Sequence, residues 1–129
     1  MSDWSNEHMA EFLKNSPDLL CIANEDGYFI ELSDNWEDIM GYTIDELKSK
    51  PYTAFIQEDF VQSTNHLKDN WMKKRDVFTS FENVYITKGG GLIRISWRAT
   101  KYIDGLTYAI GREITHEMWG HANEGHAAK

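Results

Sequence analysis

The stretch VFTSFENVYITKGGG (residues 77–91), LIRISWRATKYIDG (92–105) and LTYAIGREIT (106–115) decides the fold. Each of the three runs is rich in β-branched and aromatic residues, which favour strands. Lys-Gly-Gly-Gly separates the first two runs and Asp-Gly the last two, and glycine in such breaks accepts the positive φ that tight hairpins need. The stretch therefore predicts a three-stranded antiparallel meander.

The middle run alternates between apolar and polar side chains, which predicts one buried face and one solvent-exposed face of the sheet. The predicted inward positions of the three strands are Phe81, Asn83, Tyr85, Ile93, Ile95, Trp97, Ala99, Thr107, Ala109 and Gly111. A shift of one residue would exchange the two faces, so the assignment depends on the pairing register. Everything upstream of the meander is expected to cover its buried face.

The upstream chain predicts further elements from helical and strand periodicity, caps and breaks. They are an amphipathic helix over Asp3–Asn15 capped by Ser2 or Asp3, strands over 19–23 and 28–32, helices over 36–40 and 43–50, and a longer helix over 57–75. Thr43 and Glu46 form a capping-box pattern at the start of one helix. The expected fold class is α+β: a five-stranded antiparallel sheet with helices packed on one face. The expected organisation is a flanking helix (1–16), one domain (17–115) and a tail or truncated linker (116–129).

Composition and charge narrow the function classes. The chain has 129 residues, 41% hydrophobic and 26% charged, which is typical of one soluble globular domain. Its net charge of −8 argues against binding to nucleic acid or to an anionic membrane surface. No apolar run is long enough to span a bilayer, and the first residues lack the pattern of a signal peptide, so we expect a cytoplasmic location. A single cysteine, Cys21, excludes an internal disulfide.

Several segments together resemble a known family. Ser16–Gly27 (SPDLLCIANEDG) and Leu32–Leu47 (LSDNWEDIMGYTIDEL) resemble the opening of a PAS domain, and the segments 81–85, 97–100 and 111–115 resemble its closing strands. The resemblance implies a sensory and interaction module of signalling proteins such as bacterial histidine kinases. It also implies a cavity between sheet and helices, and output through the flanking segments to an output domain of a parent protein. In that reading Glu113, on the closing strand, is the candidate for signal relay.

The inward positions and the helices that face them define a candidate site for a small ligand. The candidate cavity residues are Trp36, Met40, Phe60, Phe81, Asn83, Tyr85, Ile95, Trp97, Ala109 and Gly111. A buried amide such as that of Asn83 needs hydrogen-bond partners, and an amide and a phenol among apolar walls suit a ligand with a few polar groups. The alternative is that large side chains fill the space and leave a core without a ligand.

Other chemistry receives less support from the sequence. The acids near predicted helix starts are explained as caps, and no nucleophile elbow, phosphate loop or zinc-protease motif is present, so we expect no enzyme. The resembled family also includes haem sensors with a histidine on the long helix, where His66 lies about one turn from the matching position. A flavin–cysteine adduct is excluded, because Tyr52 stands where the light-sensing members carry the cysteine and Cys21 lies on the first strand. The cofactor therefore stays open.

A partner surface is the remaining candidate. PAS domains commonly dimerise through a helix that precedes the sheet and through the outward sheet face. The candidate residues are Trp4, Met9, Phe12, Leu13, Tyr108 and Ile110. Three hypotheses follow: a small-ligand sensor, a ligand-free homodimerisation module, and a haem sensor through His66. In the dimerisation reading, the alternative is that the first helix only covers its own sheet.

Overall fold

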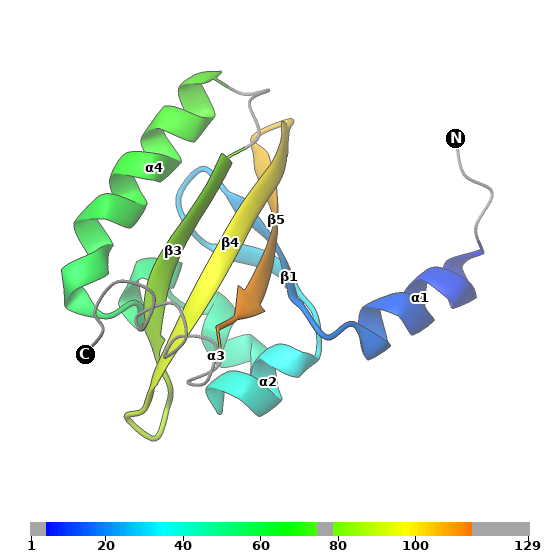
Figure 1. Ribbon diagram of the computed structural model, residues 1–129. Coiled ribbons are helices and arrows are strands. Elements are labelled where there is room, and N and C mark those ends of the chain that lie inside the picture. Colours follow the sequence, from blue (N-terminus) through cyan, green and yellow to red (C-terminus); the bar gives the residue numbers. More distant parts are fainter. Residues whose placement is uncertain (1–4, 75–78, 115–129) are drawn as a thin grey trace, which may run out of the picture.

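Five antiparallel strands form one sheet in the order β2-β1-β5-β4-β3, in a computed structural model that describes residues 5–74 and 79–114. The strands are β1 (Leu19–Asn24), β2 (Phe29–Leu32), β3 (Thr79–Ile86), β4 (Leu92–Ile103) and β5 (Leu106–Glu113). Figure 1 shows β3, β4 and β5 side by side, as the meander prediction requires. The N-terminal hairpin of β1 and β2 joins the meander because β1 pairs with β5. The first and the last strand of the chain are therefore neighbours in the sheet.

The pairing register confirms the predicted inward face. Phe81 pairs with Trp97, and Trp97 in turn pairs with Gly111, so these three residues lie in one row across the sheet. Asn83 and Ile95 form the neighbouring pair, and both are almost completely buried. The register between β4 and β5 shifts after Ala99, where a bulge interrupts the ladder.

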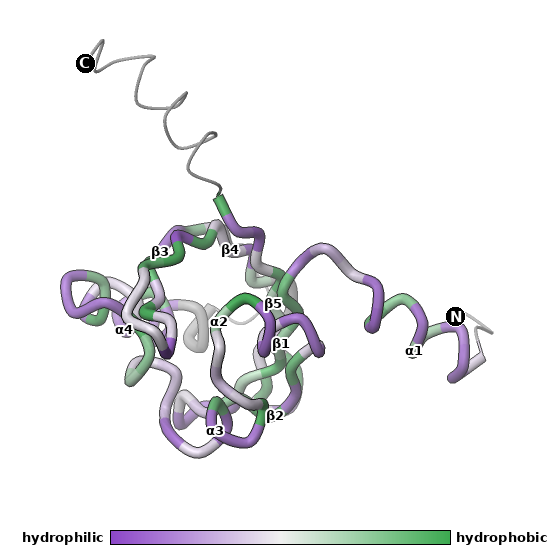
Figure 2. Tube along the Cα trace, turned by 90° about the horizontal axis from the view of Figure 1, so that it is seen from below, coloured by the Kyte–Doolittle hydropathy of each residue, from purple (hydrophilic) through white to green (hydrophobic). Residues whose placement is uncertain are grey.

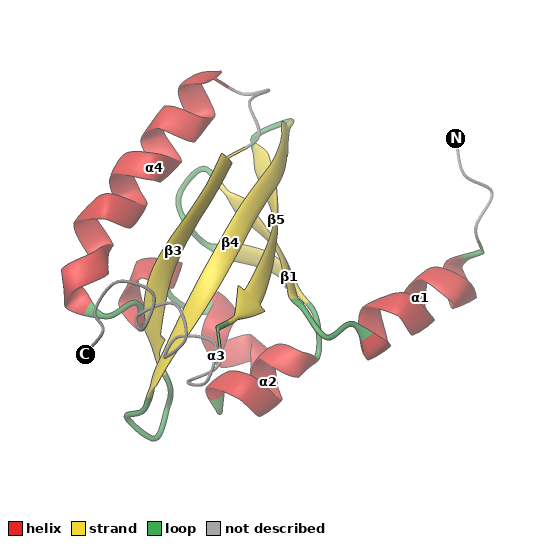
Figure 3. Cartoon of the chain, in the orientation of Figure 1, coloured by secondary structure: helices red, strands yellow, loops and turns green. Residues whose placement is uncertain are grey.

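The helices between the two sheet segments cover one face of the sheet (Figures 2 and 3). They are α2 (Asn35–Met40), α3 (Ile44–Lys48), the 3₁₀ turns η1 (Tyr52–Phe55) and η2 (Glu58–Phe60), and α4 (Val61–Lys74). The capping box is confirmed: Thr43 Oγ1 accepts from the Glu46 amide at 3.0 Å, and Glu46 Oε1 accepts from the Thr43 amide at 2.8 Å. Gly41, with φ of 83°, ends α2 in the left-handed conformation that glycine adopts without strain.

The first helix, α1 (Asn6–Asn15), stands away from the sheet in Figure 1. Its N-cap is Ser5, whose hydroxyl accepts from the His8 amide at 3.1 Å. The predicted start at Asp3 and the caps Ser2 and Asp3 fall on residues outside the described part of the chain. None of the residues of α1 is buried. The helix therefore does not cover its own sheet, which was one of the two alternatives drawn from its amphipathic pattern.

An aromatic cluster fills the centre between α2 and the sheet. Trp36 is fully buried, and its ring lies 4.9 Å from Phe29 and 5.9 Å from both Tyr85 and Trp97, measured between centroids. Its indole N–H donates to the carbonyl of Leu20 at 3.0 Å, so the polar atom of this large side chain is also satisfied. The cluster joins α2 to β1, β2, β3 and β4.

We expect Gly111→Ala to destabilise the domain by about 1–3 kcal/mol, the usual cost of overpacking a core. A Cβ at this position would lie 2.7 Å from Cζ3 of Trp97 and 2.9 Å from Cγ2 of Ile95. Gly89→Ala is the matched control, because a Cβ there meets nothing within 4 Å. Denaturant unfolding of both variants measures the difference; equal stabilities would contradict the packing of Trp97 on β5.

Candidate ligand cavity

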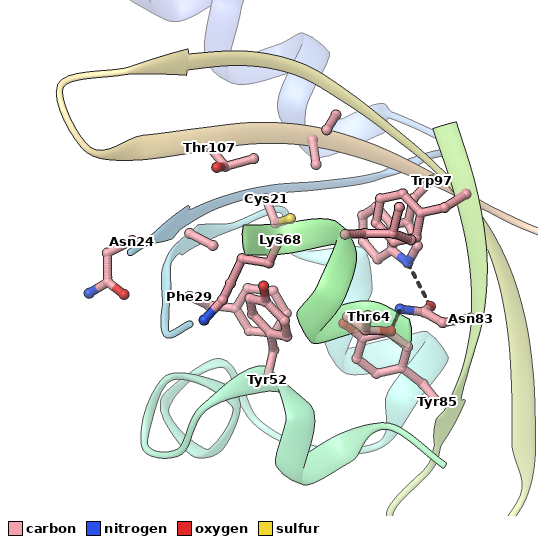
Figure 4. A pocket seen from close by; sticks show the side chains of 15 residues that line it. Cys21, Asn24, Phe29, Tyr52, Thr64, Lys68, Asn83, Tyr85, Trp97 and Thr107 are labelled. Carbon is pink, nitrogen blue, oxygen red and sulfur yellow. Dashed lines mark hydrogen bonds between the residues drawn. The ribbon is translucent and has the colours of Figure 1, made fainter. Parts of the chain in front are cut away.

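A cavity of about 70 Å³ lies between the sheet and the segments η1 and α4 (Figure 4). On the sheet side it is lined by residues of β1, β3, β4 and β5 and by Phe29, the first residue of β2. The lining residues are Cys21, Ala23, Asn24, Phe29, Tyr52, Thr64, Leu67, Lys68, Phe81, Asn83, Tyr85, Trp97, Ala99, Thr107 and Ala109. Small side chains on β1, β4 and β5 leave the space. It is bounded by the aromatic rings of Phe29, Tyr52, Phe81, Tyr85 and Trp97.

Asn83 links three elements at one wall of the cavity. Its Oδ1 accepts from the indole N–H of Trp97 on β4 at 2.9 Å, and its Nδ2 donates to the hydroxyl of Thr64 on α4 at 3.3 Å. Figure 4 shows the two bonds meeting at the amide. The amide that the sequence marks as a buried polar group is therefore satisfied on both of its ends by protein partners.

Two phenolic hydroxyls of the cavity have no such partner within the described residues. The hydroxyls of Tyr52 and Tyr85 make no hydrogen bond with any described residue, although the Tyr85 residue is only 2% exposed. Burial raises the pKa of Tyr85 and of Tyr52 well above the ordinary value, so both remain O–H donors. Figure 4 shows both phenols pointing into the cavity, Tyr52 from η1 and Tyr85 from β3.

Lys68 supplies the cavity's positive charge. It lies on α4 four residues after Thr64 and therefore on the same face of the helix. Its Nζ is 3.6 Å from the position that a Cβ on Gly27 would occupy. Lys68 is half-buried, and within the described residues its ammonium has no ion pair and no hydrogen bond.

Cys21, the single cysteine, lines the cavity from β1. Burial raises the pKa of its thiol to about 12, so the thiol stays protonated and unreactive at neutral pH. In this environment Cys21 packs as a small buried hydrophobe. Its position in the cavity wall is a finding that the sequence did not indicate.

Five of the ten predicted cavity residues line the cavity: Phe81, Asn83, Tyr85, Trp97 and Ala109. The other five do not, and the structure corrects their placement. They are Trp36, Met40, Phe60, Ile95 and Gly111.

The physical reasons differ between these five. Trp36, Met40 and Ile95 are at most 1% exposed and pack in the core beside the cavity. Phe60 lies outside the cavity, with the Cζ of Arg94 5.8 Å from its ring centre. Gly111 faces inward, but the Trp97 ring lies directly over it and separates it from the space.

The sequence reasoning missed the contributions of η1 and α4. The sequence could have indicated Tyr52 as a cavity residue, because the resemblance places it where the light-sensing members of the family carry their cysteine. Thr64 and Lys68 had a weaker signal in their four-residue spacing. Phe29 and Asn24 are set by the β1–β2 turn, in which Asn24 Oδ1 accepts from the amides of Asp26 and Tyr28, both at 3.0 Å.

The remaining candidate residues lie elsewhere. His66 is exposed on α4, with Nε2 3.2 Å from Nδ2 of Asn70, and it does not line the cavity. It is therefore not placed to ligate a haem in this cavity. Glu113 is half-buried at the end of β5, opposite Ile95.

The candidate partner residues are exposed to the extent that the structure describes them. Met9, Phe12 and Leu13 on α1 are 48%, 63% and 49% exposed, and Tyr108 and Ile110 on β5 are each 37% exposed. Trp4 lies outside the described residues.

The segment that follows α1, residues 16–18 (called the root of α1 below), is hydrogen-bonded to the side-chain amide of Asn35, the first residue of α2. Its Nδ2 donates to the carbonyls of Ser16 and Asp18, both at 3.0 Å, and its Oδ1 accepts from the Ser33 hydroxyl at 2.7 Å. Arg112 on β5 adds an exposed ion pair to Asp18 at 3.3 Å. These contacts hold the segment between α1 and β1 against the start of α2.

The buried thiol predicts a pH dependence of stability. In the unfolded chain a thiol loses its proton near the ordinary value of 9.0, whereas in the folded state the pKa of Cys21 is about 12. Between these values the folded state holds more protons, so its stability falls as the pH rises, by up to about 1 kcal/mol per pH unit.

We therefore expect the free energy of unfolding of the wild type to fall more steeply above pH 9 than that of Cys21→Ala. Denaturant titrations across pH 7 to about 11 measure both slopes. Burial is the larger cause of the raised pKa of Tyr52 and Tyr85 and acts in both proteins, whereas the charge of Cys21 raises the pKa of the phenols in the wild type only and adds to the expected difference. Parallel curves would therefore show that the Cys21 thiol titrates normally in the fold.

The comparisons with known proteins agree with this geometry. The family model of the PAS domain matches residues 17–116. No curated protein sequence matches the chain significantly. No helix of the described residues is long and apolar enough to cross a membrane.

Solved structures share the fold at low identity. The PAS domain of an HTR-like protein from Haloarcula marismortui is 19% identical with a TM-score of 0.73, over 84% of this chain and 90% of that one. A domain of the sensory box sensor histidine kinase/response regulator from Geobacter sulfurreducens is 17% identical with a TM-score of 0.69, over 82% and 91%. The RpfR quorum-sensing receptor PAS domain from Cronobacter turicensis, in complex with BDSF, is 14% identical with a TM-score of 0.69, over 79% and 98%. Because the family model spans every strand of the sheet and every residue that lines the cavity, the chain belongs to the PAS domain family.

Proposed function

We propose that this PAS domain is the sensory part of a cytoplasmic signalling protein, and that it binds a small ligand in the cavity between the sheet and α4. The observation that carries the proposal is the pair of phenols in the cavity wall, Tyr85 buried and Tyr52 partly buried, whose hydroxyls have no partner within the described residues. A buried hydroxyl without a partner costs about 1–3 kcal/mol, and an occupant of the cavity removes that cost. The cavity residues Asn83 and Trp97 hold the walls in place for it.

The size of the cavity limits the ligand. Pockets for drug-sized ligands measure roughly 300–1,000 Å³. A space of about 70 Å³ takes only a compact molecule unless the walls move. In the Cronobacter turicensis receptor the same fold is in complex with BDSF, which gives a precedent for ligand binding by the fold but does not identify the ligand here.

The ligand's state would reach the flanking segments through the aromatic cluster. Tyr85 and Trp97 line the cavity and also contact Trp36, which lies next to Asn35 in α2. Asn35 in turn holds the root of α1. Glu113, the last residue of β5, is the proposed relay toward an output domain of the parent protein.

We expect native mass spectrometry of the purified wild type to show an added mass that is lost under denaturing conditions. Ala109→Leu should lack that mass, because the larger side chain projects into the cavity that Ala109 lines. Ala54→Leu is the control, since Ala54 is exposed on η1 and does not line the cavity.

Thermal unfolding establishes that both variants fold. A wild type without added mass, even after incubation with cell extract, would contradict the ligand-binding proposal. An added mass that persists in Ala109→Leu would place the ligand elsewhere on the domain.

A second candidate function, homodimerisation, is favoured by α1. This helix buries none of its residues, yet Met9, Phe12 and Leu13 expose apolar side chains on it. Tyr108 and Ile110 add exposed apolar groups on the outward face of β5. Exposed apolar surface of this kind usually marks an interface, and a second copy of the chain offers the same surface in return.

We expect Phe12→Asp to convert a wild-type dimer into a monomer, because a buried carboxylate at a self-complementary interface is unpaired in both copies. Light scattering coupled to gel filtration measures the mass. Leu92→Asp is the control: Leu92 is 62% exposed, but it lies at the β3–β4 hairpin, away from the candidate surface. A monomeric wild type, or equal disruption by both variants, would rule out this interface.

A further inference from the structure

We propose that the ligand of this cavity is a small monocarboxylate with a compact apolar body, whose carboxylate is bound by the Lys68 ammonium and the Tyr52 hydroxyl. The inference rests on the proposed ligand-binding function and specifies the chemical class of the ligand. It follows from the charge of the cavity wall, the unpartnered donors and the position of Lys68.

The charge of the lining residues selects an anion. Lys68 is the single charged residue among those that line the cavity, and none of them is an aspartate or a glutamate. The protein as a whole carries a net charge of −8, so a cavity with one positive charge stands out from its surroundings. A ligand amine would be repelled by this ammonium, and a neutral ligand would leave it unpaired.

Three elements bring the donors to one end of the cavity. Lys68 extends from α4 toward the β1–β2 turn, where its Nζ lies next to Gly27. Tyr52 is held at the same turn, because its amide donates to the Gly27 carbonyl at 2.8 Å. Figure 4 shows the Lys68 and Tyr52 side chains entering the same part of the cavity. A carboxylate there would accept from both groups. No acid lines the cavity, although the charge of Asp69, next to Lys68 in the chain, is close enough to add to the raised pKa of Tyr52.

The phenols are suited to an anion because they stay protonated. Burial holds the pKa of Tyr52 and of Tyr85 above the ordinary value, so each donates a hydrogen bond and neither becomes a competing negative charge. Hydrogen bonds to a charged acceptor are about twice as strong as neutral ones. An anionic ligand therefore satisfies these donors better than water or an amide does.

The rest of the wall fits an apolar body of limited size. Phe29, Leu67, Phe81, Trp97, Ala99 and Ala109 surround the space with carbon. At about 10–15 Å³ per water molecule, 70 Å³ corresponds to about five to seven such volumes. Short-chain carboxylates such as butyrate are of this size.

The test compares butyrate, butyramide and butylamine, which share one carbon skeleton and differ in the charge of the head group. The ¹⁵N-labelled full chain is titrated with each, and binding is followed through the indole N–H of Trp97, assigned with Trp97→Phe. We expect the wild type to bind butyrate at least about tenfold more tightly than butyramide, with butylamine weakest.

The variant Lys68→Met keeps an unbranched side chain, one atom shorter than that of lysine, and removes the charge. It should weaken butyrate binding about tenfold and leave butyramide binding within about twofold. Tyr52→Phe should weaken butyrate binding by a smaller factor. Lys14→Met is the control, because Lys14 is exposed on α1 and does not line the cavity.

The outcomes separate the inference from the proposed function. Equal or tighter binding of butyramide or butylamine, or unchanged butyrate binding by Lys68→Met, would overturn the carboxylate inference and leave the cavity as a ligand site. No shift of the Trp97 signal with any of the three compounds would count against both.

Discussion

The two hydrogen bonds of the Asn83 amide are the constraint on which the cavity depends. They join β3 to β4 through Trp97 and β3 to α4 through Thr64. Because an amide left unpaired in the core costs more than the net gain of the bonds it makes, both partners must stay in place. A register shift of one residue would move Asn83 to the opposite face and lose both bonds, so the amide specifies the register as well as the helix position.

The position of Trp97 then determines where space is left. Its indole is fixed by Asn83 at one end, lies over Gly111 and stacks against Trp36 at 5.9 Å between centroids. The small pair Ala99 and Ala109, two positions along β4 and β5 from Trp97 and Gly111, lines the cavity and leaves it space. The contrast with Tyr85 is informative: a phenylalanine would fill the same ring volume without a hydroxyl to satisfy, so the hydroxyl adds nothing to the packing of the core. Under the proposed function, the hydroxyl would serve a ligand in the cavity.

The sequence predicted the strands, turns and caps that local chemistry determines. It did not predict which side chains reach the cavity, because that depends on tertiary packing. Alternation in 92–99 and the glycine breaks were sufficient for the meander and its inward face, and the spacing of Thr43 and Glu46 was sufficient for the capping box. Alternation cannot tell an inward residue that lines a space from one that is covered by a neighbour, and Ile95 and Gly111 were misassigned for that reason. Lys68 and Tyr52 come from a helix and a 3₁₀ turn, whose rotation over the sheet is set by tertiary contacts such as the Thr64–Asn83 bond.

The proposed route from the cavity to α1 is better supported by partly buried hydrogen bonds than by charge. The ion pair of Asp18 with Arg112 is exposed on the arginine side, and exposed pairs contribute about 0–1 kcal/mol. Asn35 makes two hydrogen bonds to the backbone at Ser16 and Asp18 from a partly buried position. Its neighbour Trp36 touches two aromatic residues of the cavity wall, Tyr85 and Trp97. Under the proposed function, a change in these walls would reach α2 through this contact. Because α2 also holds the segment that follows α1, it is the element through which the proposed signal would pass to the flanking helix.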